Sequence, residues 1–181
     1  MPTLDAPWMI DVASGSAPRA VQVLAACHAE LNADAFRSLN QAEQGMGALL
    51  EDTEPVALRA GAFDALSRQM GGFSDTTSDQ LEEDTSDLFA HLPTALRRVL
   101  DDLPHPIWMN RVGGVQEMPL DTLEEDGVRV RLLSLPPGRG VAQHTHDAEE
   151  LTLVLQGGFH DGHADYFRGD FCQGIPQLIL N

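Results

Sequence analysis

Residues 138–157 read GRGVAQHTHDAEELTLVLQG. On an extended strand, side chains two residues apart project to the same face, so His144 and His146 point the same way. A turn directly after them lets Glu150 begin the next antiparallel strand and face the two imidazoles. Two imidazoles and one carboxylate suit Zn²⁺, Mn²⁺, Fe²⁺ or Ni²⁺, and the ligand types alone do not choose among these metals. The segment therefore predicts a metal site made of His144, His146 and Glu150.

The spacing of the whole segment matters more than the histidine pair, which by itself could be two exposed loop side chains. The segment matches G-x5-H-x-H-x3-E-x6-G, the first motif of the cupin family. The fixed positions of that motif fall on Gly138, His144, His146, Glu150 and Gly157. The segment therefore resembles a cupin, and the resemblance favours the metal site over the pair of loop histidines.

A fourth ligand is the point at which the chain departs from that pattern. Cupins usually supply it as a histidine from a second motif near the next hairpin. Here no histidine follows His163, and the sequence runs through Gly169-Asp170-Phe171 to Asn181. The resemblance therefore predicts a C-terminally shortened cupin. The side chains that could complete the site instead are Cys172, His160 and His163.

The sequence around this motif predicts strands. From about Ile107, short runs rich in β-branched and aromatic residues alternate with glycine and proline. Residues 128–132, VRVRL, alternate apolar and charged side chains with period two. Several short strands at close spacing indicate an antiparallel barrel or sandwich, which we place at residues 91–181.

The N-terminal part reads as helical. Val21, Leu24, His28 and Leu31 recur on one helical face behind Pro18, which suits a first turn. Further helices are expected through residues 36–50, over 55–70 and briefly around 93–100, whereas residues 1–17 are expected to be a weakly ordered lead. Residues 73–90 carry a run of acidic side chains and predict a linker. The fold class is therefore α+β in two domains, with a small helical domain at residues 1–72.

Composition excludes several classes of function. The chain has 181 residues, 28 acidic and 11 basic side chains and a net charge of −17, and every basic residue is arginine. So acidic a chain repels phosphate backbones, so we expect no direct binding to nucleic acid. Cys27 and Cys172 lie too far apart in sequence to suggest a disulfide framework. No signal peptide or membrane span is evident, and a cytoplasmic protein is expected.

The whole chain resembles the ChrR family of zinc-dependent anti-sigma factors. In that family an N-terminal helical domain grips an extracytoplasmic-function sigma factor, and a cupin follows. The resemblance implies that partner, a metal-binding cupin that acts as sensor, and Zn²⁺ as the first choice of metal. It rests on the run HTHDAEELTLVLQG, on Trp108 and Gly169-Asp170-Phe171, and on the weaker N-terminal segments 47–51, 55–58 and 60–66.

The N-terminal zinc motif of that family, H-x3-C-x2-C, is degenerate here. His28 aligns with its histidine, but the cysteine positions fall on Asn32 and Ala35. The missing thiolates argue against zinc in this half, so apolar packing must hold its helices. We therefore expect His28 to be a core histidine with satisfied ring nitrogens, and Cys27 to be a packing residue.

Other functions stay open at this point. A metal-dependent cupin enzyme, either a dioxygenase or an isomerase of a small molecule, would also use two histidines and a carboxylate with open positions. No catalytic residue can be assigned, because no acid–base pair accompanies the motif. A third possibility is a degenerate, metal-poor paralogue. Because an incomplete barrel exposes strand edges, a homodimer through the cupin is also expected.

Overall fold

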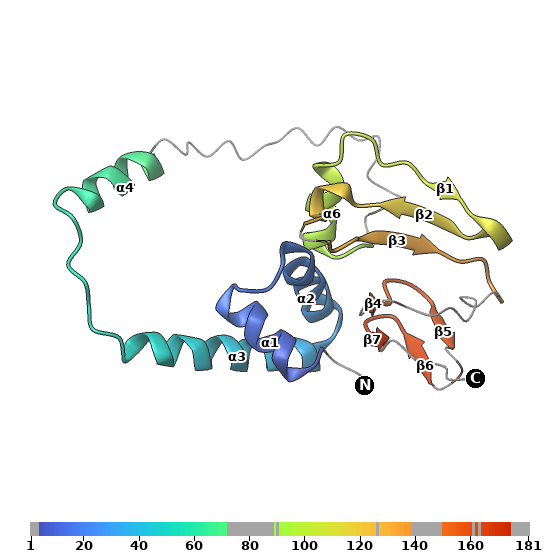
Figure 1. Cartoon of the computed structure of the whole chain (residues 1–181), viewed down its shortest axis with the longest axis horizontal. Helices are drawn as coiled ribbons and strands as arrows, with labels where there is room; N and C mark the ends of the chain where they lie inside the picture. Colours follow the sequence, from blue (N-terminus) through green and yellow to red (C-terminus); the bar gives the residue numbers. More distant parts are fainter. Residues whose placement is uncertain are drawn as a thin grey trace.

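The computed structural model describes residues 4–71, 89, 91–125, 127–138, 150–160, 162 and 164–174. Helices make up the N-terminal part and antiparallel strands most of the C-terminal part (Figure 1). The predicted linker at residues 73–90 lies outside the described residues, except for Phe89, which packs against an apolar cluster. No helix in the described part of the chain is long and apolar enough to cross a bilayer.

The first helix corrects one expectation, because residues 1–17 are not simply a weakly ordered lead. Helix α1 spans Ala6–Ser14, and the Asp5 side chain accepts a hydrogen bond from the Trp8 backbone at its start. Gly15 ends the helix in the left-handed conformation. Leu4 and Met9 are buried. The prediction missed this helix because its apolar side chains are stabilised by packing on other helices.

Helices α2 and α3 are both present as predicted, although Phe36 and Leu50, expected on the apolar face of α3, are exposed. Helix α2 spans Arg19–Leu31 with Pro18 at its N-cap, and α3 spans Ala33–Glu51. Asn32 is the single residue between them and caps α3. Helix α4 spans Ala62–Gly71, so the helix expected from residue 55 starts later. Gly61 has a φ of +77°, which is not helical, and the helix begins after it.

A three-stranded antiparallel sheet and helix α6 follow the undescribed segment. Helix α6 spans Thr94–Asp101 and confirms the short helix expected there. The strands are β1 (Met109–Asn110), β2 (Gln116–Pro119) and β3 (Arg131–Ser134), in the order β1-β2-β3. Short 3-10 turns at Val112–Gly114 and Asp121–Leu123 connect them. Strand β3 begins inside the alternating run at 128–132: Arg131 and Leu132 pair with β2, and Val128 forms an isolated bridge with Glu125.

Two further antiparallel pairs complete the described strands. Strand β4 (Glu150–Leu153) pairs with β7 (Phe171–Gly174), and β5 (Gly158–His160) pairs with β6 (Asp165–Phe167). The antiparallel class is confirmed, and the described residues form separate sheets.

Helices and strands share two apolar clusters. The first joins Ala20 and Cys27 of α2 to buried side chains of α6 and the first sheet, including Leu96 and Met118. The second joins Leu4, Met9 and Ala25 to Phe171 of β7. Both clusters therefore tie α2 to segments that follow it by more than 60 residues.

Candidate functional site

Glu150 is the one predicted metal ligand that the structure describes. It is the first residue of β4, as expected, and lies half-buried opposite Gly174 of β7. His144 and His146 lie outside the described residues. Within the part of the chain that is described, no three histidine, cysteine, aspartate or glutamate side chains gather closely enough to hold a metal ion.

The β4–β7 pair has two faces with different surroundings. Side chains alternate along each strand, so Glu150 and Thr152 share one face while Leu151 and Leu153 share the other. Leu151 packs against the second apolar cluster and Leu153 against the first. The face that carries Glu150 is therefore the one turned away from the helices.

The three substitute ligands differ in position. Cys172 lies opposite Thr152 and therefore on the same face as Glu150, diagonally across the strand pair. His160 is exposed, and its Nδ1 lies 3.0 Å from the Asp165 carboxylate across the β5–β6 pair. His163 lies outside the described residues. Of the described substitutes, Cys172 shares a face with Glu150, and His160 already has a carboxylate partner.

His28 is buried, as expected, with 1% of its surface exposed. Its ring lies 5.7 Å from the ring of Phe171, measured between centroids. The expected satisfaction of the ring nitrogens is not seen, because neither Nδ1 nor Nε2 makes a hydrogen bond of normal geometry to a described residue. Burial lowers the pKa of His28, and the Gly169 backbone and the Asp170 carboxylate oppose that shift only in part. The ring is therefore held neutral at physiological pH.

Cys27 behaves as a packing residue. It is 3% exposed within the first apolar cluster. Burial raises the pKa of its thiol to about 11, so the thiol stays protonated. A buried, protonated thiol packs as a small apolar side chain.

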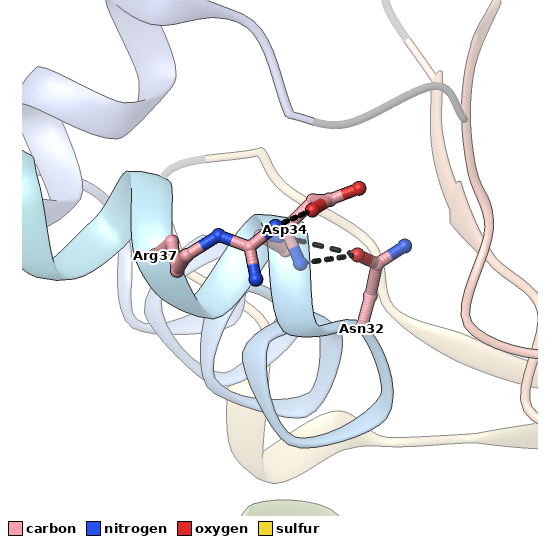
Figure 2. Close-up of polar contacts among 4 residues, drawn as sticks. Asn32, Asp34 and Arg37 are labelled. Carbon is pink, nitrogen blue, oxygen red and sulfur yellow. Dashed lines mark hydrogen bonds and ion pairs between the residues drawn. The ribbon is translucent and has the colours of Figure 1, made fainter.

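Asn32 performs a role that the sequence reasoning did not assign. Its Oδ1 accepts hydrogen bonds from the backbone N–H of Asp34 at 3.0 Å and of Ala35 at 3.2 Å, which caps α3 (Figure 2). Its Nδ2 donates to the Gly169 carbonyl at 3.3 Å. Asp34 also pairs with Arg37 one turn later. An asparagine at the break between two helical patterns is the signal that could have predicted the cap.

An unusual amount of apolar surface is exposed between the end of α3 and the first half of α4. Figure 1 shows α3 running away from α1 and α2, with α4 beyond it and apart from the strands. We name this segment, residues 49–66, the apolar arm. Its exposed apolar side chains are Leu49, Leu50, Val56, Leu58, Phe63 and Leu66, each at least 53% exposed. Such a set is typical of a protein-binding surface.

Comparisons with known proteins agree over both halves of the chain. Residues 98–176 match the family of ChrR cupin-like domains. The anti-sigma-E factor ChrR of Cereibacter sphaeroides is 31% identical over 158 residues, which cover 87% of this chain and 71% of that protein. The crystal structure of Rhodobacter sphaeroides SigE in complex with the anti-sigma ChrR contains a similar chain, at 26% identity and a TM-score of 0.71. That likeness covers 96% of this chain and 86% of the other.

Proposed function

The chain belongs to the ChrR family of anti-sigma factors, and we propose that it sequesters an extracytoplasmic-function sigma factor through its helical part. The observation that carries this proposal is that the likeness to ChrR includes the helices as well as the strands. It covers 96% of the chain in the structural comparison with ChrR, which was solved bound to SigE. In the proposed division, residues 1–72 bind the sigma factor and residues 91–181 form the cupin.

We assign sigma-factor binding to the apolar arm, residues 49–66. Phe63 and Leu66 lie on one face of α4 and are 73% and 53% exposed. Burying apolar surface of this size against a partner supplies much of the free energy of a stable complex. The arm therefore offers the helical part a surface on which a folded or partly folded sigma factor can lie.

The charge of the chain supports the same partner. A net charge of −17 attracts a basic surface and repels nucleic acid. Sigma factors carry basic surfaces that contact promoter DNA. An acidic protein bound there blocks access to DNA by position and by charge. The protein would act in the cytoplasm, where RNA polymerase is found.

For the β part we propose a metal-binding sensor at His144, His146 and Glu150. The donor types suit a divalent ion, with Zn²⁺ as first choice. Glu150 fits this role because its carboxylate lies half-buried on the strand face turned away from the helices. A bound ion would supply an open coordination position for a small oxidant or ligand. Leu151, next to Glu150, packs against the cluster that contains α1 and α2, so movement of β4 reaches the helices.

Sigma binding is tested by pull-down with the cognate sigma factor and by in vitro transcription. We expect the parent chain to inhibit transcription and Leu66→Asp to weaken both readouts, because a carboxylate replaces an exposed apolar contact. Ala65→Asp adds the same charge off the Phe63–Leu66 face of α4 and serves as the control. Transcription that is unaffected by a saturating excess of the parent chain refutes the proposal. Equal effects of the two variants refute the assignment of the arm.

The metal site is tested by elemental analysis of the purified chain. His144→Ala and His146→Ala are expected to lose metal, whereas His160→Ala keeps it, because His160 is exposed and paired with Asp165. Unchanged metal in the first two variants means that the ligands are misassigned. The homodimer through the cupin stays a prediction, and light scattering that detects only monomer at high concentration contradicts it.

A further inference from the structure

The zinc site that the family motif implies in the helical part does not fit the residues of this chain. The two thiolate positions carry Asn32, whose amide already makes three hydrogen bonds, and Ala35, which is 1% exposed and has no donor atom. His28 brings one imidazole, and no metal-binding group of three side chains forms among the described residues. A structural zinc ion needs four ligands, usually thiolates and imidazoles. Another interaction must therefore order the junction of α2 and α3.

That junction rests directly on the turn between β6 and β7. The Asn32 amide that caps α3 also donates to the carbonyl of Gly169 in the turn. Gly169 lies so close that a Cβ placed on it would stand 2.9 Å from the Leu31 carbonyl oxygen. Two residues further on, Phe171 packs beside His28 and within the cluster formed by Leu4, Met9 and Ala25. We name these interactions of Leu31, Asn32 and His28 with residues 169–171 the corner contact.

The corner contact has the properties of a structural support. Phe171 and His28 are 2% and 1% exposed, so both rings are removed from water. Asn32 satisfies two backbone N–H groups at the start of α3, which a helix end otherwise leaves unpaired. The same amide reaches across 137 residues of sequence to the turn. Polar and apolar interactions thus converge at the place where the family motif would put its ion.

We propose that in this chain the corner contact replaces the zinc ion, so that the helical part is ordered by docking on the β6–β7 turn. The strand that follows the turn, β7, pairs with β4, which begins at the predicted ligand Glu150. The residues that order the helices therefore lie on the same strand pair as the proposed sensor site. Coupling of sensor to sigma factor through this contact rests on the proposed function, whereas ordering of the helices does not.

Metal content tests the first half of the proposal in the full chain. The double variant His144→Ala, His146→Ala removes two of the three proposed cupin ligands, so stoichiometric zinc that remains points to the helical part. We expect elemental analysis to find no zinc above the buffer blank, and circular dichroism to show the helix signal of the parent with or without a chelator. Stoichiometric zinc in the double variant, or loss of its helix signal on chelation, overturns the proposal.

Hydrogen exchange tests the second half with a matched pair of glycine variants. Gly169 and Gly162 both have positive φ, +87° and +94°, so alanine strains the backbone at either site. Only the Cβ at Gly169 presses on Leu31, because the Cβ at Gly162 meets no described atom within 4 Å. We expect Gly169→Ala to speed amide exchange over residues 28–37 by about tenfold or more relative to Gly162→Ala.

Equal exchange over residues 28–37 in the two glycine variants overturns the proposal, even if both fold. If Gly169→Ala does not fold, Asn32→Ala provides the second variant, with the same expected region of faster exchange. Neither readout involves a sigma factor. If the chain does not bind a sigma factor but the two glycine variants differ in exchange as expected, only the proposed function is contradicted. If the glycine variants exchange equally, only the corner contact is contradicted.

Discussion

Replacing Phe171 with alanine tests whether helices and strands share one cooperative core. Phe171 belongs to β7 but is buried among Leu4, Met9 and Ala25 of the helical part. Its ring also lies beside that of His28. Removing the ring leaves a cavity between the helices and the strands, so both are expected to lose stability together.

The expected magnitude follows from burial. Phe171 is 2% exposed, and removing a buried phenyl ring costs about 3 to 5 kcal/mol. With a urea m-value of about 2 kcal/mol per molar, the midpoint of unfolding falls by about 1.5 to 2.5 M. Phe167→Ala is the control, because its ring is 61% exposed and its loss is expected to cost within about 0.5 kcal/mol.

Tryptophan fluorescence reads the two parts separately. The chain has two tryptophans, of which Trp8 lies in α1 against the second apolar cluster and Trp108 lies against the first. Each is observed alone after Trp→Phe replacement of the other. We expect both reporters to give the same lowered midpoint in Phe171→Ala. A lower midpoint at one tryptophan with the other unchanged refutes the shared core.

Three further outcomes are expected from single changes. Burial lowers the pKa of His28 in the folded chain, whereas in the unfolded chain His28 has its ordinary pKa of about 6.5. Below that pH the unfolded chain binds a proton that the folded chain does not, so the free energy of unfolding falls as the pH drops. Urea titrations at about pH 7.5 and pH 5.5 measure this change in the free energy of unfolding. The change is expected to be smaller in His28→Phe, whereas the exposed-site control His105→Phe keeps the change of the parent chain. Equal changes in the parent and both variants contradict the argument. Asn32→Ala removes the cap of α3 and is expected to cost about 1 kcal/mol in chemical unfolding, against almost nothing for exposed Gln44→Ala in the same helix. Leu96→Ala opens a cavity in the first cluster and is expected to cost about 2 to 5 kcal/mol by the same assay, and a cost near zero there means that α6 is not part of the core.

Local patterns in the sequence predicted most elements of the fold. The apolar face through Val21, Leu24, His28 and Leu31 predicted α2, and the β-rich segments predicted the antiparallel sheets. These predictions succeed because periodicity of 3.6 or 2 reports which side of an element is apolar. Helix α1 was missed because its apolar side chains are stabilised by contacts with α2, α3 and β7 rather than by its own pattern.

The candidate site, too, was predicted in part from the sequence and in part needed the structure. The cupin spacing placed Glu150 at the start of a strand, and the structure agrees, while His144 and His146 stay predictions. The sequence alone determined the donor types, the family resemblance and the loss of both N-terminal thiolates. Only the tertiary structure decided that Asn32 reaches Gly169, because a pattern along one chain identifies an apolar or polar position without naming the distant segment that packs against it.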